Sequence, residues 1–169
     1  MVENPMREIQ IEKVTLNVGC GDDKQKIEHA TKLLQILTGQ KPVVTVSKKR
    51  STFGMTKGKP IGVKVTLRKR RAEDFFKLLL TAQGNKLKAT QLDSQGNVTI
   101  GVKEYIDLPG IKYSHDVGML GLGTAITLMR KGRRVAERRF KKGHIGKKHK
   151  INKEEVLNWL KQKYGVEIV

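Results

Sequence analysis

The side chains that could carry out chemistry are few and widely spaced. The candidates for a nucleophile or a metal ligand are Cys20 and the histidines His29, His115, His144 and His149. His144 and His149 lie five residues apart in a basic run that repels cations, and no histidine is identifiable as a partner for Cys20. We therefore predict no catalytic residue, no metal site and no cofactor, and we expect that the chain is not an enzyme.

The glycine-rich segments do not match the motifs that bind nucleotides. Residues 54–60 faintly resemble a phosphate-binding loop, but one residue is missing between the two glycines, and Pro60 stands where a magnesium-binding hydroxyl belongs. The glycines Gly118, Gly121 and Gly123 do not have dinucleotide-binding spacing either. These glycines are therefore predicted to form turns.

The number and distribution of positive charges are the sequence features that indicate the function most clearly. The 169 residues include 35 Lys and Arg against 16 Asp and Glu, a formal net charge of +19 at pH 7. Two windows hold the whole excess: residues 41–71 contain 11 basic and no acidic residues, and residues 130–150 contain 11 basic and one acidic residue. Charge concentrated in this way creates a local positive potential that attracts phosphate groups. A nucleic acid is the expected partner.

Other classes of protein are disfavoured by what the sequence lacks. A single cysteine cannot form an intramolecular disulfide, which favours a reducing compartment. No apolar run approaches the roughly 18 residues of a membrane span, and the N-terminal residues have no apolar signal-peptide core. We expect a soluble, cytoplasmic protein without membrane contact.

Apolar periodicity indicates strands separated by helices. Strands are expected over residues 9–18, 43–47, 61–68, 98–103 and 124–129, and the first shows a one-residue slip near Glu12 and Lys13 that suggests a bulge. One helix, capped by Asp22 or Asp23, should end at Gly39. Further helices are expected over about 72–82 and 153–164, the latter with a capping box that starts at Asn152.

These elements predict an α+β fold in one domain, residues 1–169. Alternating rather than continuously apolar strands indicate a sheet of about five strands that helices cover on one face, which leaves an open polar face. Short hydrogen-bonding or cationic side chains are expected on that face: Thr15, Asn17, Lys64, Thr66, Arg68, Thr99 and Lys103.

Two segments outside the regular elements are expected to bind nucleic acid. Residues 48–60 should form a long, mobile loop, whose cations and single ring suit phosphate contact and base stacking. The candidates in this loop are Lys48, Lys49, Arg50, Phe53, Lys57 and Lys59. Residues 130–150 are expected to be a basic linker to the C-terminal helix. Candidates for contact with an RNA backbone lie in this segment and just after the strand 61–68. They are Arg70, Arg71, Arg133, Arg134, Arg138 and Arg139.

Several short sequence motifs resemble those of a known family. They are the run 37–42 (Leu-Thr-Gly-Gln-Lys-Pro), the run 51–54 (Ser-Thr-Phe-Gly), the run 59–68 that ends in Val-Thr-Leu-Arg, and the opening 11–19. Together with residues 105–110, they resemble the large-subunit ribosomal protein L5 family, which binds 5S rRNA. The ending, 146–155, looks like the archaeal branch of that family. The resemblance covers nearly the whole chain.

The resemblance implies a largely antiparallel sheet, a structural role in the central protuberance of the large ribosomal subunit, and no catalysis. It implies that Asn17, Gln40 and Thr66 hydrogen-bond 5S rRNA, and we place Lys41, Lys64 and Arg68 in the same site. It also implies that the loop 48–60 contacts P-site tRNA, that other basic surfaces contact large-subunit rRNA, and that a small-subunit head protein is a neighbour. The alternatives are a generic architectural nucleic-acid-binding protein and, less favoured, an RNA-modifying enzyme.

Overall fold

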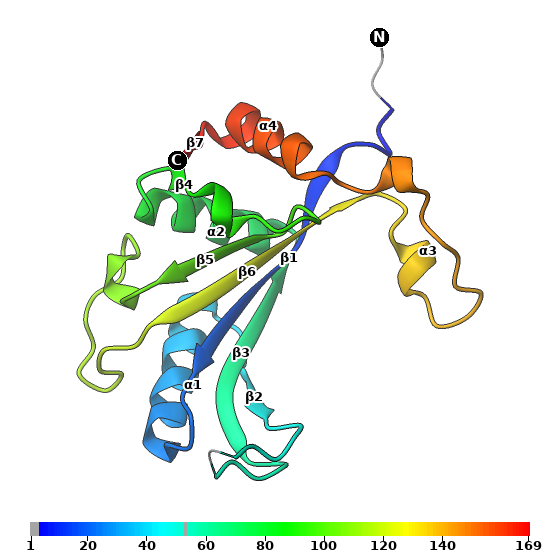
Figure 1. Cartoon of the computed structure of the whole chain (residues 1–169). Helices are drawn as coiled ribbons and strands as arrows, with labels where there is room; N and C mark the ends of the chain where they lie inside the picture. Colours follow the sequence, from blue (N-terminus) through cyan, green and yellow to red (C-terminus); the bar gives the residue numbers. More distant parts are fainter. Residues whose placement is uncertain (1–3, 53) are drawn as a thin grey trace. The chain divides into compact units, whose positions relative to one another are not determined.

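A computed structural model describes residues 4–52 and 54–169 (Figure 1). Among these residues, five strands form the main sheet in the order β2-β3-β1-β6-β5, and the sheet is antiparallel. These strands are β1 (Ile9–Gly19), β2 (Val43–Val46), β3 (Pro60–Arg68), β5 (Val98–Val102) and β6 (Leu122–Arg130). Two short strands, β4 (Lys86–Leu87) and β7 (Glu167–Ile168), pair in parallel. The predicted α+β class is confirmed.

In the described part of the chain, four α-helices and three short 3-10 turns join the strands. The helices are α1 (Lys24–Thr38), α2 (Arg70–Ala82), α3 (Arg134–Glu137) and α4 (Lys153–Tyr164), and the 3-10 turns are η1 (Ala89–Gln91), η2 (Tyr105–Asp107) and η3 (Lys147–His149). None of the helices within the described residues is long and apolar enough to cross a membrane.

The helix ends follow the capping residues that the sequence supplies. The Asp23 side chain accepts hydrogen bonds from the backbone N–H groups of the first turn of α1, and Gly39 ends that helix with a φ of 62°. At the start of α4, the carboxylate of Glu155 accepts a hydrogen bond of 3.2 Å from the backbone N–H of Asn152. The predicted caps of both helices are confirmed.

Some boundaries differ from the sequence-based expectations. Helix α2 begins at Arg70 rather than Ala72, because the backbone turns at Lys69, whose φ is 58°. Pro60, expected to close the loop 48–60, is the first residue of β3. Strand β6 is longer than expected and ends at Arg130, so the first residue of the basic segment 130–150 belongs to the sheet.

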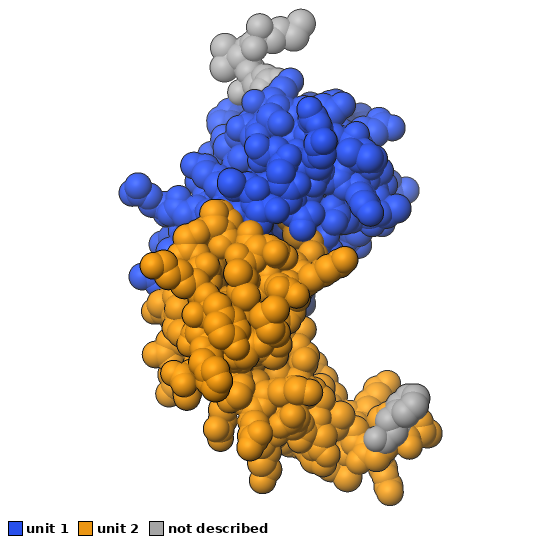
Figure 2. All heavy atoms as spheres, turned by 90° about the vertical axis from the view of Figure 1, so that its left-hand side faces the viewer, with its two compact units in different colours: residues 1–14, 68–99, 125–169 blue, residues 15–67, 100–124 orange. Residues whose placement is uncertain are grey.

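The chain divides into two compact units (Figure 2). The first contains Met1–Val14, Arg68–Thr99 and Ala125–Val169, and the second contains Thr15–Leu67 and Ile100–Thr124. In the second unit, Leu33 of α1 packs with Tyr105 and Val117 in a buried cluster. In the first unit, Phe76 of α2 meets Tyr164 of α4 edge to face, with ring centres 5.1 Å apart. Each unit therefore has its own packed interior.

Burial alternates along the strands as the sequence pattern predicts. In β3, Val63, Val65 and Leu67 are buried, whereas the residues between them are exposed. In β1 the alternation changes phase, because the adjacent residues Ile11 and Glu12 are both buried. The expected slip near Glu12 is confirmed. The slip buries the carboxylate of Glu12 among apolar residues of the strand.

Candidate nucleic-acid interface

The exposed side of β1 and β3 carries hydrogen-bonding groups that the protein itself does not use. Asn17 alternates with buried Leu16 and Val18, and Lys64 and Thr66 alternate with the buried residues of β3. Within the described part of the chain, the side chains of Asn17, Lys64 and Thr66 form no hydrogen bond or ion pair. Their polar atoms are therefore available to a ligand.

Two further candidates follow the end of α1. Gln40 is half-buried, and its backbone N–H donates a hydrogen bond of 3.3 Å to the Thr38 hydroxyl. Lys41 is exposed, and β2 begins two residues later. Because β2 pairs with β3, with Val43 opposite Lys64, this turn lies at the same edge of the sheet as the exposed residues of β3. Gln40 and Lys41 thus precede the strand residue that pairs with Lys64, and all three belong to the second unit.

The loop between β2 and β3 is closed at its base by backbone hydrogen bonds. The N–H of Ser47 donates to the carbonyl of Lys59 at 2.8 Å, and the N–H of Gly58 donates to the carbonyl of Ser47 at 2.9 Å. Beyond them, the cations Lys48, Lys49, Arg50 and Lys57 are all exposed. The hairpin therefore presents its cations to solvent.

Two candidates of this loop differ from the rest. Lys59 is half-buried, and its ammonium group forms an ion pair with Asp22, so it is not a free cation. Phe53 lies outside the described residues.

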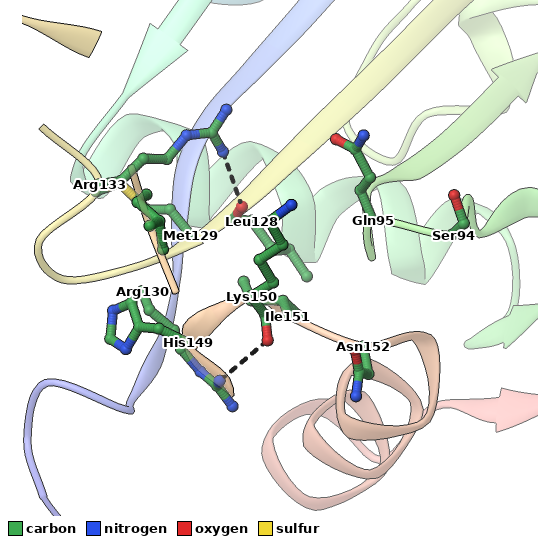
Figure 3. Close-up of a pocket in the computed structure, with 11 residues that line it drawn as sticks. Ser94, Gln95, Leu128, Met129, Arg130, Arg133, His149, Lys150, Ile151 and Asn152 are labelled. Carbon is green, nitrogen blue, oxygen red and sulfur yellow. Dashed lines mark hydrogen bonds between the residues drawn. The ribbon is translucent and has the colours of Figure 1, made fainter. Parts of the chain in front are cut away.

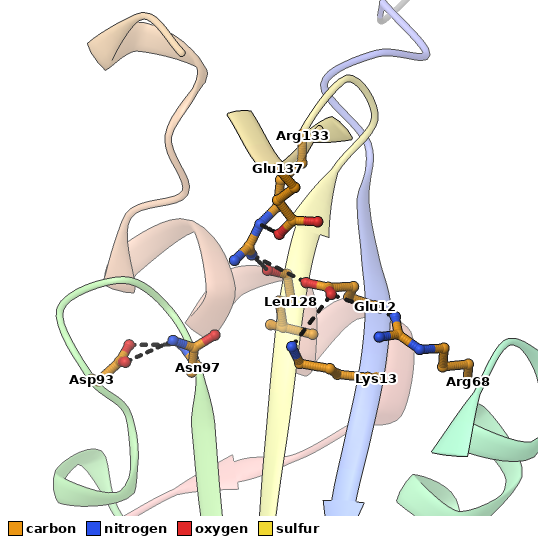
Figure 4. A network of polar contacts seen from close by, with 8 residues as sticks. All are labelled: Glu12, Lys13, Arg68, Asp93, Asn97, Leu128, Arg133 and Glu137. Atoms are coloured by element: carbon orange, nitrogen blue, oxygen red, sulfur yellow. Dashed lines mark hydrogen bonds and ion pairs between the residues drawn. The ribbon is translucent and has the colours of Figure 1, made fainter. Parts of the chain in front are cut away.

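At the other end of β3, three cations surround one carboxylate (Figure 4). Oε1 of Glu12 lies 3.5 Å from the ammonium group of Lys13 and 3.6 Å from Nη1 of Arg68, and Oε2 lies 3.3 Å from Nη1 of Arg133. Arg133 also pairs with Glu137, its Nε lying 2.8 Å from Oε1 of that carboxylate. All five residues belong to the first unit.

The basic segment 130–150 belongs to the first unit and is anchored at both ends to other parts of that unit. Arg130 is only 7% exposed, and its guanidinium donates to the carbonyl oxygens of Arg7 at 3.0 Å and Lys150 at 3.2 Å and to the Glu155 carboxylate at 2.9 Å. His149 is bonded through Nε2 to the carbonyl of Lys131 at 2.9 Å. These contacts fix both ends of the segment.

A cavity opens beside this anchor (Figure 3). Leu128, Met129 and Ile151 supply apolar lining, and Arg133 and Lys150 bring positive charge to it. In the close-up, the Arg133 guanidinium donates to the Leu128 carbonyl at 3.4 Å. The cavity is thus part of the same cationic region.

The other backbone-contact candidates are dispersed. Arg70 and Arg71 are exposed in the first turn of α2, and Arg134 is exposed on α3. Arg138 donates a hydrogen bond of 2.7 Å to the carbonyl of Lys141, and the Arg139 guanidinium lies 5.2 Å from the centre of the Phe140 ring. These arginines therefore have different surroundings.

Cys20 is a packed side chain. It is 7% exposed, its thiol lies 3.5 Å from the carbonyl of Lys26, and burial, followed by the charge of Asp23, raises its pKa against the opposing effect of Lys26. A raised pKa disfavours the nucleophilic thiolate. The surroundings of Cys20 are those of a structural side chain.

Sequence reasoning missed the roles of Glu12, Lys13 and Arg130. A signal for the first was present, because an acidic residue at a phase slip in an amphipathic strand must either be exposed or find cations. Which cations it finds depends on residues far away in the sequence. Arg130 carried no local signal, since it stands among other arginines and lysines.

A polar sheet surface with unused hydrogen-bonding groups, next to exposed cations, defines a basic protein suited to a polyanionic partner. Comparison with known proteins identifies the family. Residues 4–53 match the family described as "Ribosomal protein L5", and residues 60–159 match "ribosomal L5P family C-terminus". The chain belongs to the ribosomal protein L5 family, and it is a structural, non-enzymatic constituent of the large ribosomal subunit.

Archaeal relatives align along almost the whole chain. The large ribosomal subunit protein uL5 of Sulfurisphaera tokodaii is 48% identical over 168 residues, which cover 98% of this chain and 95% of that protein. The uL5 protein of Nanoarchaeum equitans is 45% identical over 170 residues, covering 99% and 100%. That of Archaeoglobus fulgidus is 42% identical over 159 residues, covering 94% and 89%. The expected similarity to the archaeal branch is confirmed.

Proposed function

We propose that the chain binds 5S rRNA through the exposed side of its main sheet. The observation that supports this most is the set of unused polar groups on β1 and β3, namely Asn17, Lys64 and Thr66. The short side chains of Asn17 and Thr66 lose little conformational freedom on binding and can read the shape of a folded RNA through its base edges and 2′-hydroxyls, and Lys64 adds a positive charge beside them. Gln40, Lys41 and Arg68 extend the proposed site.

The two basic windows supply the affinity in this proposal. Cations that neutralise phosphates release counterions, so the binding constant falls steeply as salt rises. Residues 130–150, with Arg70 and Arg71, are proposed to contact large-subunit rRNA. These contacts would position the protein without selecting a sequence, because phosphates are the same in every RNA.

The hairpin between β2 and β3 is proposed to contact P-site tRNA. Its exposed cations Lys48, Lys49, Arg50 and Lys57 stand beyond the backbone bonds that close its base. A small-subunit head protein is proposed as a neighbour on the ribosome. Deletion of residues 50–58 should leave 5S rRNA binding and the thermal unfolding midpoint nearly unchanged and should weaken tRNA binding. Loss of the folded state would contradict this part of the proposal.

The decisive experiment is a competition between RNAs and DNA. Labelled 5S rRNA bound to the full chain is displaced with unlabelled 5S rRNA, tRNA or duplex DNA, and the anisotropy of the label is recorded at several salt concentrations. We expect unlabelled 5S rRNA to compete best and the affinity to fall steeply with salt. Equal competition by duplex DNA would instead support the generic architectural nucleic-acid-binding protein.

Substitutions separate specific recognition from charge. Asn17→Ala and Thr66→Ala leave the net charge unchanged, and each should weaken 5S rRNA binding by about fivefold or more, since each leaves an RNA group unpaired. Thr90→Ala is the matched control, because Thr90 is an exposed threonine of η1, outside the sheet. Equal losses on random duplex RNA would contradict a specific sheet surface.

A further inference from the structure

The carboxylate of Glu12 is buried, whereas the three cations around it are accessible to solvent. The Glu12 side chain is 7% exposed, against 32% for Lys13, 37% for Arg133 and 59% for Arg68. The buried Oε2 accepts no hydrogen bond within the described residues, although Nη1 of Arg133 is 3.3 Å away. A ligand arriving from solvent would therefore reach the three cations but not the anion that holds them.

Glu12 holds cations that come from three different parts of the chain. Lys13 is its neighbour in β1, Arg68 is the last residue of β3, and Arg133 follows β6. The phase slip in β1 permits this arrangement, because it buries the Glu12 side chain, and the ammonium group of the next residue, Lys13, lies 3.5 Å from the carboxylate. One buried carboxylate thus gathers three cations from positions 13, 68 and 133 of the sequence.

Glu137 provides a contrast within the same cluster. It pairs with Arg133 four residues earlier, on the short helix α3, and its side chain is 52% exposed. A pair of this kind is weak, since water screens it and competes for both partners. An incoming anion can replace Glu137 on Arg133, whereas it cannot replace Glu12.

We propose that Lys13, Arg68 and Arg133 form one binding site for a backbone phosphate of 5S rRNA, so that Arg133, unlike the rest of residues 130–150, contacts 5S rRNA, and that Glu12 is the positioning residue of this site. The inference rests on the proposed function, which supplies the RNA. Arginine and lysine side chains lose much rotamer freedom when they bind, and a guanidinium binds phosphate well only in a suitable orientation. Glu12 fixes that orientation before the RNA arrives. Three cations around one carboxylate still leave a positive charge for the phosphate.

Two substitutions that change the net charge equally are expected to have opposite effects on RNA affinity. Glu12→Gln and Glu137→Gln each remove one negative charge and one partner of Arg133. Because Glu12 orients the site, Glu12→Gln should weaken binding of 5S rRNA by about tenfold, the effect of one charge-assisted contact that is no longer held in place. Because Glu137 competes with phosphate, Glu137→Gln should strengthen binding by about twofold. Affinities are measured by fluorescence anisotropy with the full chain at constant salt.

A further pair of variants tests whether Glu12 acts through the arginines. In a chain that carries Arg68→Gln and Arg133→Gln, the additional change Glu12→Gln should no longer weaken binding, whereas a general structural effect would persist there. Circular dichroism melts show whether each variant is folded at the assay temperature. If Glu12→Gln unfolds the chain, the test uses Arg68→Gln, Arg133→Gln and the double variant. If both arginines bind one phosphate, the fold loss of affinity in the double variant should be smaller than the product of the fold losses in the two single variants.

The results distinguish this site from the proposed function. Tighter binding of Glu12→Gln, in parallel with Glu137→Gln, would mean that Glu12 merely masks positive charge, and the site would be refuted while 5S rRNA binding stood. A wild-type chain that does not bind 5S rRNA would refute the proposed function, and the RNA ligand of this site with it.

Discussion

Replacement of Arg130 by methionine tests whether the basic segment is held to the first unit by this one buried guanidinium. Methionine keeps the length and the apolar stem of the side chain, so that the change removes charge and hydrogen bonds rather than packing. The three bonds that disappear join Arg130 to the carbonyl oxygens of Arg7 and Lys150 and to the carboxylate of Glu155.

The expected loss of stability follows from the exposure of the partners. Hydrogen bonds to a charged group contribute about 1.5–3 kcal/mol each when both partners are buried. Here Arg7 and Lys150 are exposed and the Glu155 side chain is 41% exposed, so that water can replace the lost donor at each acceptor. We therefore expect Arg130→Met to lower the free energy of unfolding by about 2 kcal/mol in total, rather than by the sum of three buried bonds.

The assay is urea unfolding at neutral pH, followed by circular dichroism. Arg134→Met is the matched control: it removes the same charge from an exposed side chain that has no partner within the described residues, and it should cost less than about 0.5 kcal/mol. Arg130→Lys should fall between the two, since one ammonium cannot reach all three acceptors. Equal stability of Arg130→Met and Arg134→Met would refute the view that Arg130 anchors the segment.

Three further predictions concern packing and titration. A Cβ on Gly62 would lie 2.6 Å from the carbonyl oxygen of Val18, so Gly62→Ala should cost about 2 kcal/mol in urea unfolding, whereas Gly101→Ala, which meets nothing within 4 Å, should cost little; equal costs would contradict this close approach. Burial raises the pKa of Glu155, but its hydrogen bonds and the positive charges of Arg130 and Arg7 outweigh burial and lower it. The stabilisation that accompanies a lowered pKa is complete above the unfolded-state value of about 4.3 and is lost as the pH falls through the lower folded-state pKa, so the stability difference between wild type and Glu155→Gln should shrink on acidification; a constant difference would argue against it. Because burial raises the pKa of Cys20, a thiol reagent should label it slowly in the folded chain and quickly in urea, and rapid labelling of the folded chain would count against this packing.

Features that depend on neighbouring residues could be predicted from the sequence. The ends of α1 and α4 follow from Asp23, Gly39 and the Asn152–Glu155 pair, because a cap needs partners only three or four residues away. The exposed positions of β3 follow from strict alternation. The candidates Asn17, Lys64 and Thr66 were found for the same reason, as polar positions in amphipathic strands.

Features that depend on distant residues could not be predicted. The two-residue strands β4 and β7 pair residues that are 81 positions apart, and they have no periodicity of their own. The cluster around Glu12 joins residues 12, 68 and 133, and the anchor of Arg130 joins residues 7, 130, 150 and 155. A run of arginines does not reveal which of them is buried, because that depends on where carbonyl and carboxylate groups lie in the folded chain.

The net charge of the sequence therefore overstates the number of cations that are free to meet RNA. The two basic windows contain 22 Lys and Arg, of which Lys59, Arg68, Arg130, Lys131 and Arg133 are ion-paired with Asp or Glu. The other 17 have no such partner within the described residues. Salt dependence reports the phosphates that are actually neutralised, with a slope of about 0.9 per phosphate on a duplex. A cation held as firmly as Arg130 adds nothing to that slope, whereas Arg68, open to solvent beside a closed carboxylate, is oriented by its pair and still available to phosphate.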